Sequence, residues 1–215
     1  MKIDAPRMNA PALALVEDAE PGDALDPAGT DGLRIAEAVF DAVTRHDATY
    51  RETELVRATV TGSHFTNCRF IDVRFEGLDA PDLIAARSTW RDTEILGSRL
   101  GTAGLYDATV SSLRLERCKI GFLGLQGAEV HDLLVESCTV DELDLTEAKL
   151  TRVAFRDTTI GELRLAHSQL SHVDLRGARL GAVSPTLGLR GAVVTVEQLL
   201  DLAPVLAHEA GIVVE

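Results

Sequence analysis

The chain has 215 residues, of which 46% are apolar and 26% charged, so it is long enough for one sizeable core and has a globular composition. It contains no run of 18 apolar residues, which excludes a membrane-spanning helix of ordinary length. The net charge of −13 argues against direct binding to nucleic acid, because the phosphate backbone repels such a protein. Three cysteines without close pairing, and a start that lacks a secretory apolar stretch, predict a reduced, cytoplasmic protein.

The first segment, residues 1–32, is rich in Ala, Pro, Asp and Gly. It holds seven acids and two bases, a net charge of −5. We expect a loosely ordered N-terminal lead-in, in which Ala14-Leu15-Val16 is the candidate for pairing with the element that follows.

A five-residue period runs over residues 33–180. Every fifth residue from Ile35 onward is large and apolar at 27 of 30 positions, the exceptions being Arg45, Ala80 and Ala85. The position two residues earlier is always Ala, Val, Leu, Cys, Ser or Thr. A period of five matches neither a helix nor a flat strand. The pattern instead predicts a chain that turns a corner every five residues and points two side chains of each five inward.

Four such sides close a coil of 20 residues, and successive coils stack by parallel backbone hydrogen bonds about 4.8 Å apart. The 30 five-residue units then form a rod about 36 Å long. Residues 20 apart should lie in columns on its surface. One such column, Glu54, Arg74, Glu94 and Arg114, alternates in sign as a cross-strand ladder prefers, which supports the 20-residue coil.

Several units carry a small residue, a polar residue and then a large aliphatic one, as in Ala148-Lys149-Leu150 and Ala178-Arg179-Leu180. These units resemble the repeat of the pentapeptide-repeat family over 148 of the 215 residues. The resemblance implies an all-β fold, a right-handed quadrilateral parallel β-helix, which we assign to residues 33–194. The quinolone-resistance members, which the chain resembles in overall layout, are acidic rod-shaped dimers that mimic the DNA duplex and occupy DNA gyrase.

The C-terminal part, residues 195–215, has a different pattern. Pro185 breaks the frame, which resumes one residue early at Ala192-Val193-Val194. Thr195 and Gln198 then have the spacing of a capping box at a helix start. We expect a helix that caps the rod and that, as in some family members, forms a homodimer contact. The candidate contact residues are Leu199, Leu202 and Leu206.

Groups able to perform catalysis or to bind metal do not gather in the sequence. Cys68, Cys118 and Cys138 all occupy inward small positions, which favours buried thiols over a metal or redox pair. The six histidines lack metal-ligand spacing, and neither a phosphate-binding glycine loop nor a nucleophile motif is present. We therefore expect a non-enzymatic protein without metal or cofactor; the alternative is a sugar-cleaving site of the kind that other β-helices carry.

One long single-sign stretch, between Ile120 and Ala148, contains acids and no Lys or Arg. Its spacing wraps the acids around more than one side of the rod, and basic residues flank it on both sides. We interpret this acidic belt as a candidate partner-binding patch; the alternative is a solvated surface neutralised by neighbouring coils. The acidic belt consists of Glu129, Asp132, Glu136, Asp141, Glu142, Asp144 and Glu147.

Two hypotheses of function follow from these features. In the first, the resemblance implies a DNA-mimicking modulator of DNA gyrase or topoisomerase, linked to antibiotic resistance. In the second, the chain is a protein-binding scaffold unrelated to topoisomerases. The repeat region 33–180 carries 23 acids and 18 bases, which makes it a poor imitation of a polyanion and keeps the second hypothesis open.

Overall fold

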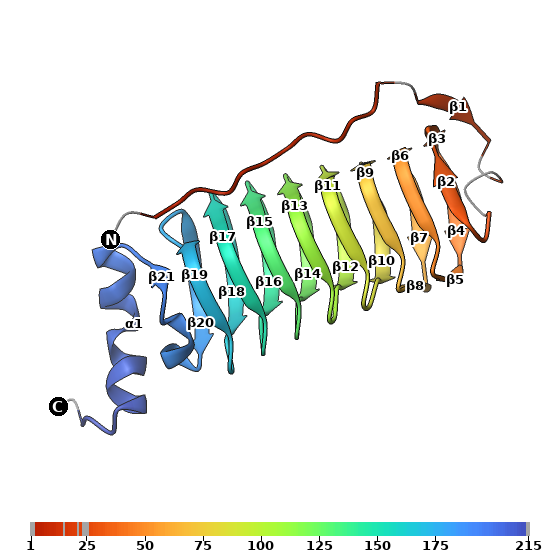
Figure 1. Cartoon of the computed structure of the whole chain (residues 1–215). Coiled ribbons are helices and arrows are strands. Elements are labelled where there is room, and N and C mark those ends of the chain that lie inside the picture. The colour runs from red at the N-terminus through yellow and green to blue at the C-terminus, as the bar shows by residue number, and fades with distance from the viewer. Residues whose placement is uncertain (1–2, 15, 21, 23–25, 214–215) are drawn as a thin grey trace.

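The computed structural model describes residues 3–14, 16–20, 22 and 26–213 and shows a rod of stacked β coils (Figure 1). Two parallel sheets run along the rod, sheet A with eleven strands and sheet B with ten. The strands of sheet A are β1 (Glu17–Ala19), β2 (Gly29–Asp31), β3 (Leu33–Ala36), β6 (Thr49–Val56), β9 (Arg69–Glu76), β11 (Thr89–Leu96), β13 (Thr109–Glu116), β15 (Glu129–Glu136), β17 (Lys149–Arg156), β19 (Gln169–Asp174) and β21 (Ala192–Val193). Those of sheet B are β4 (Val39–Asp41), β5 (Thr44–His46), β7 (Thr59–Thr61), β8 (Ser63–Thr66), β10 (Asp79–Ile84), β12 (Arg99–Gly104), β14 (Lys119–Gly124), β16 (Thr139–Asp144), β18 (Thr158–Arg164) and β20 (Ala178–Ser184).

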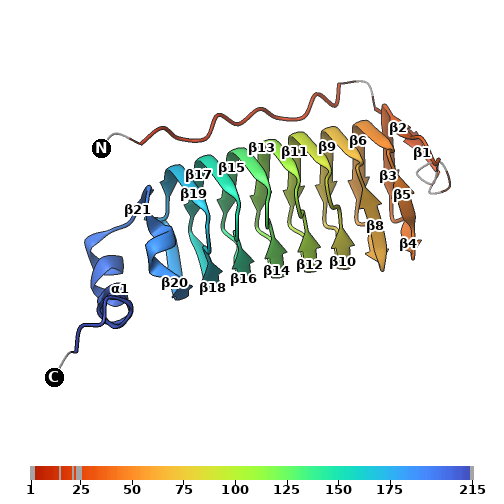
Figure 2. The ribbon, with the colours of Figure 1, turned by 60° about the horizontal axis from the view of Figure 1, so that its bottom comes forward.

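The pairing register repeats every 20 residues. Thr89 of β11 pairs with Arg69 on one side and with Thr109 on the other, and sheet B pairs Arg99 with Lys119 in the same way. All of these ladders are parallel, so each coil lies directly on the preceding one (Figure 2). The 20-residue coil predicted from the five-residue frame is confirmed.

Corners occur where the backbone adopts positive φ. Asp72, Asp92 and Asp132, each in the middle of an eight-residue strand of sheet A, have φ of 56°, 52° and 61°. Aspartate tolerates this left-handed conformation better than most residues, because its short side chain forms local hydrogen bonds. Each long strand is thereby folded into two sides of the coil.

The interior is a single column of apolar side chains. At the N-terminal end it is aromatic: the Phe70 ring lies 5.2 Å from that of Tyr50 and 4.3 Å from that of Trp90. Toward the C-terminal end it is mostly aliphatic, with Phe155 the large exception. The predicted inward positions therefore form the core, and the all-β quadrilateral β-helix is confirmed as the fold class.

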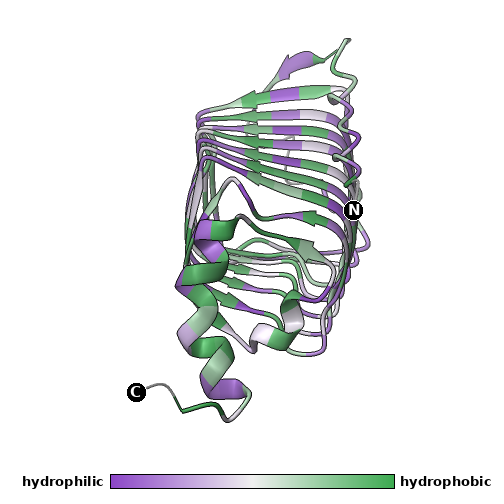
Figure 3. Cartoon of the chain, turned by 90° about the vertical axis from the view of Figure 1, so that its left-hand side faces the viewer, coloured by the Kyte–Doolittle hydropathy of each residue, from purple (hydrophilic) through white to green (hydrophobic). Residues whose placement is uncertain are grey.

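The C-terminal end of the rod is covered by a helix, α1 (Val196–Glu209) (Figure 3). Before it, a short 3-10 helix (Thr186–Leu189) interrupts the coil, and Ala192 then pairs with Val173, a register of 19 rather than 20 residues. Thr195 caps α1 with the expected capping box, in which its Oγ1 accepts from the N–H of Gln198. The C-terminal capping helix is confirmed.

The described part of the N-terminal segment lies against the rod. Residues 3–14 follow an extended path along the outside of the rod (Figure 1). Pairing with the coils begins only at β1, where Glu17 aligns with Leu33. Of the candidate pairing segment Ala14-Leu15-Val16, Leu15 lies outside the described residues.

Candidate partner-binding surfaces

The acidic belt is divided between the two sheets. Glu129, Asp132 and Glu136 belong to β15 of sheet A, whereas Asp141, Glu142 and Asp144 belong to β16 of sheet B. Glu147 lies at the corner after β16, with φ of 60°. The coil therefore places the seven carboxylates on different sides of the rod and does not bring them together in one cluster.

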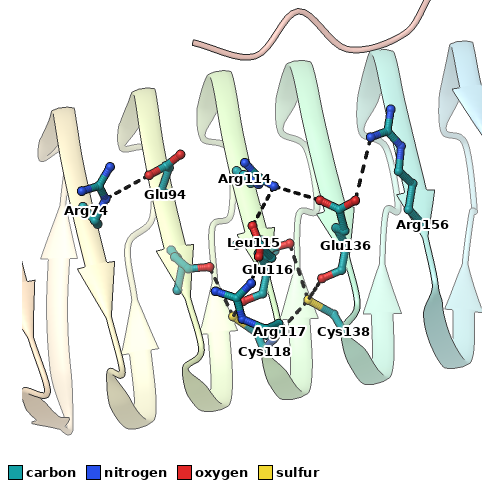
Figure 4. Close-up of polar contacts among 11 residues, drawn as sticks. Arg74, Glu94, Arg114, Leu115, Glu116, Arg117, Cys118, Glu136, Cys138 and Arg156 are labelled. Carbon is teal, nitrogen blue, oxygen red and sulfur yellow. Dashed lines mark hydrogen bonds and ion pairs between the residues drawn. The ribbon is translucent and has the colours of Figure 1, made fainter. Parts of the chain in front are cut away.

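The sheet A acids are largely neutralised by arginines of neighbouring coils. Asp132 accepts from Nε and Nη2 of Arg152, both at 2.6 Å. Glu136 lies 2.9 Å from Arg114 and 3.9 Å from Arg156 (Figure 4). A linear sequence cannot show this compensation, because the partners are 20 or 22 residues away and become neighbours only when the coils stack.

Asp132 is the most enclosed of the three sheet A acids of the belt. Burial acts to raise the pKa of its carboxyl group, but hydrogen bonds from the Arg152 side chain and the Arg7 backbone N–H outweigh this effect. The net pKa of Asp132 therefore lies below its ordinary value. The carboxylate is charged at neutral pH and accepts hydrogen bonds from both the Arg152 guanidinium and the Arg7 backbone N–H.

The sheet B acids keep an excess of negative charge. Glu142 is stacked on Glu162 of β18, and the two share one guanidinium, that of Arg164, at 3.0 and 2.8 Å. Asp141 is exposed, and within the part of the chain that the structure describes it forms no ion pair. Asp144 is buried and accepts from Gln126 Nε2 at 2.9 Å, so it contributes little surface charge. We call Asp141, Glu142 and Glu162 the sheet B acidic patch.

The predicted column of alternating charge is present on sheet A but is interrupted. Arg34 contacts Glu54 at 2.9 Å, Arg74 contacts Glu54 at 3.5 Å, and Arg74 contacts Glu94 at 3.0 Å. Arg114 turns instead toward Glu116 and Glu136, at 2.7 and 2.9 Å (Figure 4). These partly exposed pairs contribute about 0–1 kcal/mol each, and they leave this side of the rod nearly neutral.

A second surface runs along one corner of sheet A. We call residues 3–14 the N-terminal strap, and we call the six positive-φ residues beneath it the corner column. The corner column consists of Asp72, Asp92, Ser112, Asp132, Arg152 and His172, spaced 20 apart.

The strap binds this column mainly through its own backbone. The N–H groups of Asp4, Arg7, Asn9 and Ala12 donate to His172 Nδ1, Asp132 Oδ1, Ser112 Oγ and Asp72 Oδ1, at 3.0, 2.8, 2.9 and 3.1 Å respectively. The Asn9 side chain adds a bond to Asp92 at 3.0 Å. Sequence reasoning missed this surface; the available signal was the row of polar residues spaced 20 apart from Asp72 to His172.

The expected dimer residues lie on two different faces of α1. Leu202 is 6% exposed and belongs to the core, and Leu206 packs against that core. Leu199 faces away and is 50% exposed, next to Leu200 at 67%. Leu202 and Leu206 therefore fix α1 on the rod, and an apolar strip that includes Leu199 and Leu200 faces outward.

The cysteines and histidines do not form a site. Cys68, Cys118 and Cys138 are free and buried, and the Cys138 Sγ accepts from the Cys118 backbone N–H at 3.3 Å. Among the described residues no group of three or more His, Cys, Asp or Glu side chains is placed to hold a metal ion. No helix in the described ranges is long and apolar enough to cross a membrane.

The five-residue frame, the 20-residue coil and the two parallel sheets define a pentapeptide-repeat solenoid. It is similar to a trypsin-treated variant of QnrB1, a plasmid-mediated fluoroquinolone resistance protein, with 18% identity, a TM-score of 0.46, and coverage of 94% of this chain and 97% of that chain. It is also similar to HetL of Nostoc sp. strain PCC 7120, a pentapeptide repeat protein involved in heterocyst differentiation regulation, with 15% identity, a TM-score of 0.26, and coverage of 80% and 93%. No protein-family model matches the sequence, and no curated protein matches it.

Proposed function

We propose that this protein is a non-catalytic rod that uses the sheet B acidic patch to occupy a positively charged surface on a protein partner. The observation that carries the proposal is the charge balance of the patch: Glu142 and Glu162 share the guanidinium of Arg164, and among the described residues Asp141 has no ion pair. The sheet A acids, in contrast, meet arginines in adjacent coils. An excess of carboxylates on a rigid sheet is complementary to a surface rich in Lys and Arg.

The first candidate partner is DNA gyrase or a related topoisomerase, whose DNA-binding surface is positive. In this proposal the rod acts as a DNA mimic and competes with the duplex. The reduced size of the patch, three carboxylates rather than the seven of the acidic belt, predicts a weak and salt-sensitive competitor. The alternative is a scaffold for a protein unrelated to topoisomerases.

A supercoiling assay with purified gyrase, at low and at physiological salt, tests this proposal. We expect inhibition or protection by the parent at low salt, decreasing as salt rises, and loss of the effect in Asp141→Lys/Glu162→Lys. The matched control is Asp79→Lys/Glu129→Lys, which makes the same charge change at exposed strand positions outside the patch. If the parent leaves gyrase unaffected at low salt, the gyrase proposal fails and the scaffold alternative stands.

We also propose that the outer face of α1 pairs two rods into a homodimer. Leu199 and Leu200 are 50% and 67% exposed, and Val196 beside them is 71% exposed, so apolar side chains line one face of a short helix. Burial of such a face stabilises association. Sedimentation should show a dimer for the parent and a monomer for Leu199→Ser/Leu200→Ser; a dimer in both would place the contact elsewhere.

A further inference from the structure

The N-terminal strap is held on the rod in the way that a peptide ligand is held by a receptor. Among the described residues, no backbone–backbone hydrogen bond joins residues 3–14 to a coil, and the first such pairing follows at Glu17. The strap is instead bound by side-chain acceptors of the corner column. It is therefore an occupant of the rod surface and not an additional strand of sheet A.

The corner column recognises main chain rather than particular side chains. Four of the donors in the strap are backbone N–H groups, which every residue except proline supplies. The two prolines, Pro6 and Pro11, lack an N–H, but they lie between the donor positions. Neither proline therefore removes a hydrogen bond to the corner column. Any extended peptide with free N–H groups at these positions can make the same bonds.

The spacing of the bonds indicates the conformation that fits. Ala12 binds Asp72 and Asp4 binds His172, so eight residues of strap cover five coils. Five coils at about 4.8 Å span about 24 Å, or about 3.0 Å per residue. This rise is close to the roughly 3.1 Å of a polyproline II helix, a conformation that many recognition modules select.

Apolar side chains accompany the line of acceptors. Ile3, Pro6, Met8 and Leu13 are half-buried and Pro11 is buried, whereas the strap residues between them are exposed. On the rod, Val56, Ile71, Leu134 and Ala154 stand outside the inward frame and the core, yet all are buried. Pro6 and Met8 line one cleft with Leu134 and with the charged Arg114, Glu136 and Arg156. Ile3 and Ala5 line a second cleft with Ala154, Asp174 and Arg176.

The charge of the corner column is not matched by its occupant. The column contains three carboxylates and one guanidinium, that of Arg152, which is paired with Asp132. Asp92 lies 3.8 Å from Arg91, and in the described ranges Asp72 has no ion pair. Residues 3–14 carry one acid, Asp4, and one base, Arg7, and are neutral overall. A peptide with additional basic residues opposite Asp72 and Asp92 would complement the column better than the strap does.

From these observations we propose that the corner column is a binding track for an extended, basic, proline-containing peptide of a partner protein, and that the N-terminal strap is its resident occupant. The partner peptide displaces the strap and makes the same main-chain bonds. This proposal concerns sheet A and is independent of the sheet B acidic patch.

The test uses the full chain with a protease site inserted after Ala14, so that the protein folds with its strap attached and is cut afterwards. The probe is a fluorescein-labelled peptide with the sequence of residues 3–14. We expect the cut protein to bind it at least tenfold more tightly than the uncut protein, in which the tethered strap competes at high effective concentration. A second peptide, with Lys in place of Ala10, should bind more tightly still and lose that advantage as salt rises.

Two comparisons test whether the main chain is recognised. Methylation of the amide nitrogens of Arg7 and Ala12 in the peptide should weaken binding at least tenfold, whereas Met8→Leu should change it less than threefold. On the rod, Asp72→Ala/Ser112→Ala removes two acceptors and should weaken binding at least tenfold. The matched control is Asp107→Ala/Ser137→Ala, which changes exposed corner residues of φ 54° that do not contact the strap.

Three results would overturn the proposal. If the cut strap never exchanges with the labelled peptide, it is a permanent structural element. If the methylated peptide binds as well as the parent peptide, the corner column does not recognise main chain. If only the native sequence binds and the cut protein doubles in mass, the site accepts the strap of a second copy and not a partner peptide.

Discussion

Replacing Phe155 by alanine tests whether the stacked interior carries the stability of the rod. Phe155 is 2% exposed and lies in a column between Val135 and Leu175, which are 0% and 2% exposed. A buried Phe removes about 150–250 Å² from water, worth about 4–6 kcal/mol at roughly 25 cal/mol per Å², and Phe→Ala changes in cores cost about 3–5 kcal/mol. For a chain of this size about 2–4 °C is lost per kcal/mol, so the midpoint should fall by about 6–20 °C.

The control for this change is the next residue in the chain. Arg156 points outward with a side chain 54% exposed, and its contact with Glu136 is 3.9 Å long. Such a pair contributes about 0–1 kcal/mol, so Arg156→Ala should lower the midpoint by at most about 4 °C. Thermal unfolding followed by far-UV circular dichroism measures both. Equal shifts in the two variants, or a shift within about 2 °C for Phe155→Ala, would refute the packing argument.

Three further predictions concern the strap, the thiols and the cap. Because the pKa of Asp132 is lowered in the folded protein, its charge stabilises the docked strap above the ordinary pKa of about 3.9, and that stabilisation is lost as the pH falls through the lower folded value. The Arg7 amide should therefore lose hydrogen-exchange protection below about pH 4; unchanged protection there would contradict the role of Asp132. The three buried cysteines should react with a thiol reagent only after denaturation, and fast reaction of the native protein would show that the interior opens. Leu202→Ala should cost about 2–5 kcal/mol and Leu199→Ala less than about 1 kcal/mol, since only Leu202 enters the core; similar denaturant midpoints for the two variants would show that α1 does not cap the rod.

The fold could be predicted from the sequence because every five-residue unit repeats the same pattern of inward and outward side chains. Each inward position recurs every five residues, and the ladder that follows, such as Thr89 on Arg69, depends only on that spacing. The helix cap was equally local, because Thr195 and Gln198 lie three residues apart. Repeat spacing and capping residues can both be recognised in a single sequence.

The candidate surfaces were harder to predict because they depend on which side chain reaches which neighbour. Glu136 and Arg114 are 22 residues apart, and a belt that has no bases along the chain has them across the coils. Leu202 and Leu199 satisfy the same helical pattern, and only the docking of α1 decides which one faces the core. The strap has no repeat of its own, so its path along the rod had no periodic signal.

The path of the strap has a consequence for the order of folding. The coils form contacts between residues 20 apart, whereas the strap joins residues between 60 and 168 apart, such as Ala12 with Asp72 and Asp4 with His172. Contacts that close such long loops form late, because the entropy of closure is recovered only when the receiving surface already exists. Stacked coils can grow one upon another from any starting point, but the strap finds all its acceptors only on a rod in which five successive coils are complete. Docking of the strap therefore reports that assembly of this part of the rod has finished.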